Sequence, residues 1–220
     1  MSKNSKAYIM LILASLFWAG NFTIGKFAYT ENVPPYSLAF FRWILVWIIL
    51  LPFTYKEISK INTEVKNNLS LFFILGFTSV GIFSAFTYNA LNYTQVINAS
   101  LFNTAIPVSI ILVCFLFKIE KTNFFQISGL IVSVLGILAI ITRLDLNILL
   151  TLNFNKGDIY MVIAIISWGI YSAFLKKKTF DISLLSLVHV VCTFGLIILL
   201  PAFLFELNQG KTTEINSNLI

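Results

Sequence analysis

A few polar and aromatic side chains interrupt the long apolar runs of this sequence, and their chemistry could serve a function. Arg42 is the one permanent charge well inside such a run. An arginine at the bilayer centre costs about 2.5–3.5 kcal/mol on insertion scales. A polar cavity, a structural partner or the carboxylate or phosphate of a solute could compensate that cost. Alternatively, Arg42 extends outward from its position near one end of the run and anchors at the surface.

Three asparagines and two tryptophans are further candidates. Asn21, Asn98 and Asn103 are predicted to form a polar strip that faces the interior of a helix bundle. They either contact a solute or hydrogen-bond to neighbouring helices. Trp18 and Trp168 either line a solute pathway as rigid amphipathic walls or pack in the core.

The sole histidine, His189, either couples transport to protons or is a hydrogen-bonded packing residue. The predicted substrate-binding or pathway residues are therefore Trp18, Asn21, Arg42, Asn98, Asn103, Trp168 and His189.

The groups that membrane enzymes need are missing from the apolar runs. The carboxylates of Asp158, Asp181 and Glu206 lie at the ends of runs. Neither the paired carboxylates of an aspartyl protease nor a set of metal ligands on facing helices is therefore present. The sequence also has no P-loop. We predict no catalytic residue, no metal site, no cofactor and no enzyme activity.

Composition indicates that lipid surrounds most side chains. Of the 220 residues, 58% are hydrophobic and 11% are charged, against about 25% charged in soluble domains. The net charge is +6, but the lysines lie in short gaps between apolar runs. This pattern is typical of membrane orientation rather than of nucleic-acid binding. The predicted partners are the lipid bilayer and a small-molecule solute, with no nucleic acid.

Seven membrane spans are predicted, because a helix needs about 20 apolar residues to cross the hydrocarbon. Residues 67–117 carry no charge and are too many for one crossing, so the polar stretch around Asn92 divides them. The first run could imitate a signal peptide, but more apolar sequence follows it. The predicted spans are about 7–27, 36–54, 70–88, 95–117, 123–142, 159–175 and 182–205.

The distribution of Lys and Arg predicts the orientation. Ten of the fifteen lie on the side of the N-terminus, four lie on the other side, and Arg42 is inside a span. Because cytoplasmic loops carry the excess of positive charge, we expect a cytoplasmic N-terminus.

An internal repeat links the first and sixth spans. Trp18 aligns with Trp168, and Lys26 aligns with Lys176 at the same offset. The alternative is a chance pairing. The copies are five spans apart, so they enter the bilayer from opposite faces. Inverted repeats of this kind build many secondary transporters, with substrate bound near the midplane.

Four other residues are expected to be structural. Tyr88 and Tyr171 are predicted to lie at the membrane interfaces. Pro107 predicts a kink within its span. Gly129, four residues before a serine, predicts close packing against another helix.

Several motifs resemble those of EamA-type transporters in the drug/metabolite transporter superfamily. The segment Phe17-Trp18-Ala19-Gly20-Asn21-Phe22 is similar to their first-helix motif, and Pro34-Pro35 with the following Ser37–Arg42 resembles their Pro-rich loop and second-helix Arg. The remaining matches are Ala90–Thr94 at the entry to the fourth helix, Pro107 inside it, Glu120 in the next loop, and Gly129 and Gly136 in the fifth helix.

The resemblance implies ten spans in two inverted five-helix repeats. It implies a permease of small organic metabolites, working by alternating access in a bacterial inner membrane. Residues 7–142 would form the first repeat, 158–205 the first two helices of the second, and 206–220 a polar tail. We thus expect an all-α membrane protein of about seven spans, C-terminally truncated by three helices and with a face open to self-association. The alternative is a non-transporting membrane fragment or scaffold.

Overall fold

The computed structural model describes residues 3–120, 123–142 and 155–210, and over these residues its regular secondary structure is entirely helical. Six helical segments are long and apolar enough to cross a membrane, and a seventh contains the shorter apolar stretch Phe124–Gly136. The predicted all-α membrane fold of about seven spans is therefore confirmed. The helices are α1 (Lys3–Thr30), α2 (Pro35–Thr54), α3 (Ile58–Asn67), α4 (Leu69–Gly76), α5 (Ser84–Leu91), α6 (Val96–Asn103), α7 (Ile106–Leu116), α8 (Phe124–Thr142), α10 (Lys156–Lys176) and α11 (Leu184–Asn208).

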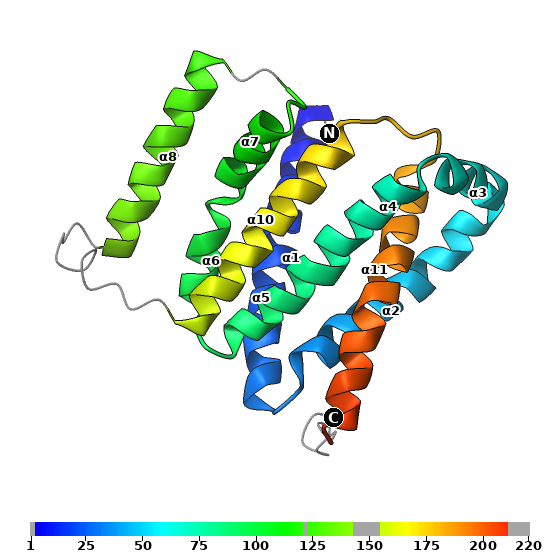
Figure 1. The fold of residues 1–220 in the computed structure, drawn as a ribbon, viewed down its shortest axis with the longest axis horizontal. Coiled ribbons are helices and arrows are strands. Elements are labelled where there is room, and N and C mark those ends of the chain that lie inside the picture. The colour runs from blue at the N-terminus through cyan, green and yellow to red at the C-terminus, as the bar shows by residue number, and fades with distance from the viewer. Residues whose placement is uncertain (1–2, 121–122, 143–154, 211–220) are drawn as a thin grey trace.

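The long helices lie side by side as a single bundle (Figure 1). The N-terminus lies at one end of this bundle, and α11 ends near the other. Helices α1 and α10 run in opposite directions, as the predicted inverted repeat requires. An odd number of crossings separates these two helices, so the span count alone also explains their direction. The division of the chain into two repeats stays a prediction.

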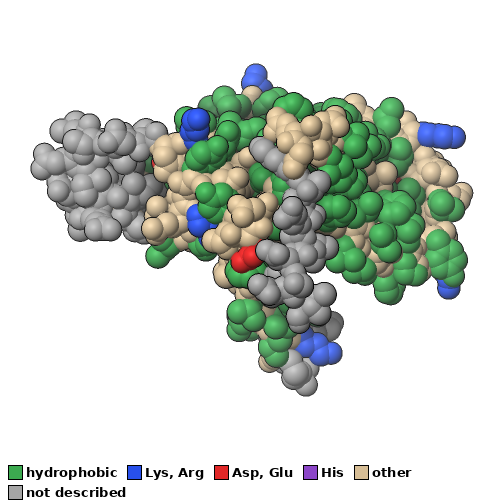
Figure 2. All heavy atoms as spheres, turned by 90° about the horizontal axis from the view of Figure 1, so that it is seen from below, with side chains coloured by type: hydrophobic (Ala, Val, Ile, Leu, Met, Phe, Trp, Pro, Cys, Tyr) green, Lys and Arg blue, Asp and Glu red, His purple; other side chains and the backbone are tan. Residues whose placement is uncertain are grey.

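The outer surface of the bundle is strongly apolar. On α1, Leu11, Ile12 and Leu16 are each more than half exposed. Figure 2 shows hydrophobic side chains over much of the face it presents, with few and scattered Lys and Arg. An apolar surface of this extent is favourable in contact with lipid hydrocarbon and unfavourable in contact with water. Lipid is therefore the solvent of the bundle.

The core lies where the third span meets α10 and α11. Its fully buried side chains come from all three spans and include Phe72, Met161 and Leu199. Two glycines let the third span and α11 approach closely: a Cβ on Gly76 would lie 2.6 Å from Cβ of Phe194, and one on Gly195 would overlap Cβ of Val80. Small residues at such crossings give membrane helices their packing contacts.

Two spans are interrupted. Between α4 and α5 the third span forms a π-helix, Phe77–Phe83. The fourth span is broken at Thr104–Ala105, and α7 then begins with Pro107 in its first turn. Proline lacks the N–H that would continue the helical hydrogen bonds. The break in the helix thus lies directly before Pro107, where a kink was predicted.

The connection after the second span contains helix α3, which the sequence analysis did not identify. Its apolar residues Ile61 and Val65 pack against the core, and its polar residues other than Glu64 are exposed. This spacing of four residues is typical of a helix with one apolar face.

Two structural expectations are wrong. The ring of Tyr88 is buried inside the bundle and not at an interface, because its hydroxyl hydrogen-bonds to Asn21. Gly129 has open space around the position of a Cβ, with no described atom of another helix within 4 Å. It therefore does not mediate a close helix contact there.

We expect Gly195→Ala to lower the free energy of unfolding by about 1–3 kcal/mol, because the added methyl group must displace Val80. Gly129→Ala is the matched control and should leave stability unchanged or slightly raised, since alanine favours helices. Unfolding of the two purified variants in detergent checks the difference. Equal stability of both would contradict the close packing of the third span against α11.

Candidate functional site

The side chain of Arg42 points into the bundle and is held by two other helices. Its Nη1 donates to Oδ1 of Asn21 on α1 at 2.5 Å, and its Nη2 donates to Oγ of Ser84 on α5 at 3.1 Å. The outward-extending alternative does not describe this arrangement. The contacts of Arg42 are those of a structural partner inside the bundle.

Two aromatic residues complete the Arg42 cluster, which consists of Arg42, Asn21, Ser84, Trp43 and Tyr88. Trp43 donates from Nε1 to Oγ of Ser84 at 2.8 Å, and the Tyr88 hydroxyl donates to Oδ1 of Asn21 at 2.7 Å. The guanidinium carbon lies 4.7 Å from the Trp43 ring centroid and 5.3 Å from that of Tyr88. Such cation–π contacts stabilise a cation by about 0.5–2 kcal/mol.

All these partners of Arg42 are electrically neutral. The ion pairs formed among the described residues are Lys176 with Glu120 and Lys178 with Glu64, and neither involves Arg42. Amide and hydroxyl oxygens satisfy part of the guanidinium, which has five N–H donors in a fixed fork. The cluster therefore keeps a net positive charge, and an anion would be attracted to it.

The π-helix of the third span ends directly before Ser84. Single π-turns within helices change the direction of the residues that follow and are frequent at functional sites. Here Ser84 directly after the π-helix contacts Arg42 and Trp43, while the preceding Phe83 packs on Trp168 with ring centroids 4.6 Å apart. The π-helix therefore links the Arg42 cluster to an aromatic contact on α10.

The two predicted pathway tryptophans meet. The ring centroids of Trp18 on α1 and Trp168 on α10 lie 5.7 Å apart. Tyr171 also packs against Trp168, at 5.0 Å. Asn21 lies one helical turn after Trp18, so the aromatic contact and the Arg42 cluster are neighbours along α1.

The other predicted site residues lie apart from the Arg42 cluster. Asn98 is exposed and lines an open polar cavity of about 590 Å³ that also includes Lys26 and Asn155. The Oδ1 atom of Asn103 is buried without a hydrogen-bond partner among the described residues. His189 shares a hydrogen bond of 2.6 Å between its Nδ1 and Oγ1 of Thr54. The predicted strip of three asparagines does not form.

The sequence analysis did not predict Ser84, Tyr88 and Trp43 as site residues. Ser84 and Tyr88 are four residues apart and share one face of α5, from which Ser84 reaches α2 and Tyr88 reaches α1. That spacing was a usable signal. What the sequence lacked was the rotation of the third span, which depends on the π-turn.

A bundle of lipid-facing helices around an interior polar site defines a polytopic integral membrane protein. Comparison with known proteins identifies the particular group. The EamA-like transporter family matches residues 5–142, which is more than half of the chain. The chain therefore belongs to the EamA-like transporter family, and it is a membrane transporter in that general sense.

Known relatives extend the match over nearly the whole chain. An uncharacterized transporter of Archaeoglobus fulgidus is 26% identical over 98% of this chain and 72% of its own length. The uncharacterized transporter YyaM of Bacillus subtilis is 22% identical over 97% of the chain and 70% of its own length. The WAT1-related protein At2g39510 of Arabidopsis thaliana is 29% identical, over 55% of the chain and 33% of its own length. No solved structure matches the chain.

We expect Asn21→Ala to lower the free energy of unfolding by about 1–3 kcal/mol, because it removes the acceptor shared by Arg42 and Tyr88. Thr23→Ala on the same helix is the control, since that hydroxyl is exposed and bonds only to the backbone oxygen of Ala19. Thermal unfolding of both variants in detergent measures the effect. If Asn21→Ala is no less stable than Thr23→Ala, the Arg42 cluster does not hold α1 in place.

Proposed function

We propose that this protein carries small organic metabolites across a bacterial inner membrane by alternating access, and that the solute passes the Arg42 cluster. The observation that carries this proposal is the Arg42 guanidinium inside the bundle with neutral partners only, beside the contact of Trp18 with Trp168. The relatives are described as transporters, which supports a transport role but names no solute.

The contact between the two tryptophans supports a central pathway. In a pair of inverted repeats, a twofold axis relates equivalent residues, and equivalents that touch each other must lie close to that axis. Trp18 and Trp168 are the equivalent residues of the predicted repeat, and their rings are in contact. Inverted-repeat transporters bind substrate near the midplane between the repeats. The solute pathway would therefore run past these rings.

The charge of the Arg42 cluster favours a solute with an anionic group. Arginine pairs with a carboxylate or phosphate through two parallel hydrogen bonds. In the low-dielectric interior of the bundle, such a pair is much stronger than in water. The flanking rings of Trp43 and Tyr88 suit an apolar portion of the same solute. A small organic acid combines both features.

The proposed orientation places the N-terminus in the cytoplasm, because that side of the predicted topology carries ten Lys and Arg residues against four. Helix α3 and the α10–α11 connection then face the cytoplasm. The end of α11 faces the outside.

We expect Arg42→Ala to lower the rate of solute transport by about tenfold or more, equivalent to about 1.4 kcal/mol, at unchanged protein level in the membrane. Arg42→Lys keeps the charge but loses the planar fork, so it should restore transport only if charge alone matters. Uptake and efflux of labelled small carboxylic acids in cells provide the measurement, with Thr23→Ala as the control.

Wild-type transport by Arg42→Ala would leave Arg42 a purely structural residue and refute its proposed role. A chain that reaches the membrane and moves none of the acids in either direction would favour the competing proposal, a non-transporting membrane scaffold.

The orientation has a separate test. A cysteine at Gln209, which is exposed after α11, should react with an impermeant maleimide added outside intact cells, and a cysteine at the exposed Lys60 should react only after the cells are broken open. The reverse pattern would invert the topology.

A further inference from the structure

A buried carboxylate joins α11 to the beginning of α2. Glu206, near the end of α11, is only 3% exposed. Its Oε2 accepts hydrogen bonds from the backbone N–H of Ser37 at 2.7 Å and from the Ser37 hydroxyl at 2.9 Å, while its Oε1 accepts from the N–H of Tyr36 at 3.1 Å. The first N–H groups of a helix have no partner within the helix. Glu206 supplies that partner from another span.

A second carboxylate makes the reciprocal connection at the opposite end of the pair. Glu57 ends the short 3₁₀ turn Tyr55–Glu57 that follows α2, and its Oε2 accepts from the N–H of Ser183 at 3.1 Å and from the hydroxyl of Ser186 at 2.5 Å. Ser183 is the residue that caps α11, and Ser186 is fully buried in its first turn. The N-terminus of α2 is thus held by Glu206 at the end of α11. The N-terminus of the antiparallel α11 is held by Glu57, which lies after the end of α2.

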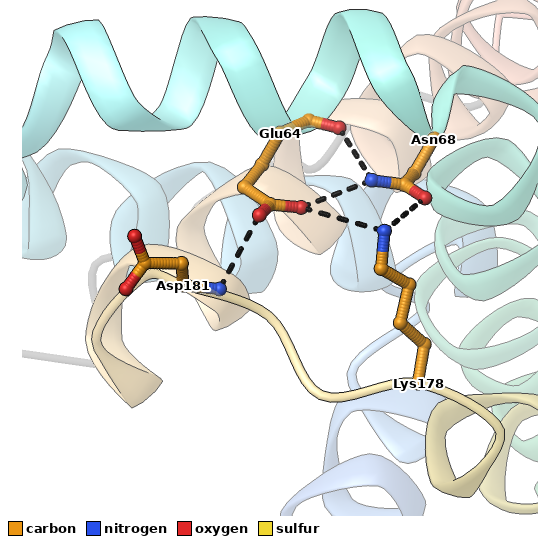
Figure 3. A network of polar contacts seen from close by, with 4 residues as sticks. All are labelled: Glu64, Asn68, Lys178 and Asp181. Carbon is orange, nitrogen blue, oxygen red and sulfur yellow. Dashed lines mark hydrogen bonds and ion pairs between the residues drawn. The ribbon is translucent and has the colours of Figure 1, made fainter.

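Further polar contacts strengthen the end of the pair that contains Glu57. Figure 3 shows Glu64 of α3 between the α10–α11 connection and the beginning of α4. Its Oε1 accepts from the N–H of Asp181 at 3.4 Å, and its Oε2 lies 3.9 Å from Nζ of Lys178. Lys178 in turn donates to Oδ1 of Asn68 at 2.6 Å. The connection that leads into α11 is therefore bound to the segment that follows α2.

Between the two ends, polar and aromatic contacts continue along the interface. The Trp47 indole N–H donates to Oγ1 of Thr193 at 2.9 Å, and Thr54 shares a hydrogen bond of 2.6 Å with His189. Closer to Glu206, the rings of Phe40 and Phe203 are stacked, with centroids 4.6 Å apart. Separation of α2 from α11 at Glu206, Trp47 or Thr54 would leave polar groups without partners in a medium without water.

We infer that α2 and α11 stay joined at both ends as one rigid unit, with Glu206 and Glu57 as the positioning residues that hold it together. If Glu206, which is 3% exposed, lost its donors inside the bundle, it would carry an uncompensated charge, which is far costlier than breaking a neutral hydrogen bond. Glu57 lies at the partly exposed end of the pair and acts through its hydrogen bonds to Ser183 and Ser186. If the proposed alternating access holds, the movements that open each face must come from other helices, such as α1 and α10, turning against this unit.

Spin-label distance measurements on the purified chain in lipid nanodiscs test the inference without any solute. After replacement of Cys114 and Cys192 by alanine, one pair of labels at Leu45 and Leu204 reports the half of the unit that contains Glu206. A second pair at Phe53 and Leu185 reports the half that contains Glu57. All four side chains are exposed toward lipid. Each pair should give one narrow distance distribution.

Substitution of the two glutamates should act locally. Glu206→Gln loses the charge and one acceptor oxygen, so we expect a second, longer distance for the Leu45/Leu204 pair while the Phe53/Leu185 pair stays narrow. Glu57→Gln should have the opposite effect. Glu31→Gln is the matched control, because Glu31 is an exposed carboxylate in the connection that leads to α2. It should alter neither pair.

Two results would overturn the inference: two populated distances for either pair in the chain with both glutamates intact, or narrow distances for both pairs in Glu206→Gln and Glu57→Gln. Local broadening supports it even where a variant is less stable, because the unaffected pair reports that the fold is intact. A third pair of spin labels, at Phe17 on α1 and Ile166 on α10, measures the distance between these two helices. One narrow distance there would count against the proposed alternating access, while the rigid α2–α11 unit would stand.

Discussion

The rest of the structure depends on the pairing of α2 with α11, which is held by the buried Glu206 carboxylate. The first N–H groups of a helix need hydrogen-bond acceptors, and in a bilayer water does not supply them. Since Pro35 has no N–H, the donors at Tyr36 and Ser37 are the first that require a partner. Once Glu206 meets them, α2 lies antiparallel to α11, and its position determines where Arg42 enters the bundle.

The two charges associated with α2 are compensated in different ways. Glu206 receives three hydrogen bonds, which suit a carboxylate with no further task. Arg42 donates only to neutral oxygens and lies against aromatic rings, and its guanidinium has more donors than these partners use. Helix α2 thus has a fully hydrogen-bonded carboxylate at its N-terminus and an incompletely neutralised cation, Arg42, further along. This difference is why we place the solute at Arg42 and assign Glu206 a positioning role.

Part of the candidate site was readable from residue type and spacing. An arginine inside an apolar run must have compensating partners, so Arg42 was identifiable, and Asn21 proved to be one of those partners. Recurrence at a fixed offset singled out Trp18 and Trp168, whose rings are in contact. Asn98 and Asn103 lie elsewhere because α6 ends at a break before Pro107, so that span is not one straight helix with a single polar face.

The sequence by itself determined the class of the protein, because hydrocarbon thickness and the cost of burying charge limit where apolar runs and lysines can lie. It therefore predicted the number and approximate bounds of the spans. Only the tertiary structure decided which side chains meet: the rotation that brings Ser84 to Arg42, and the contact between Glu206 and Ser37, which are 169 residues apart. Lipid-facing and buried positions of these helices are equally apolar, so periodicity cannot orient them. Close packing at Gly76 and Gly195, and polar pairs between distant spans, set the rotation of each helix.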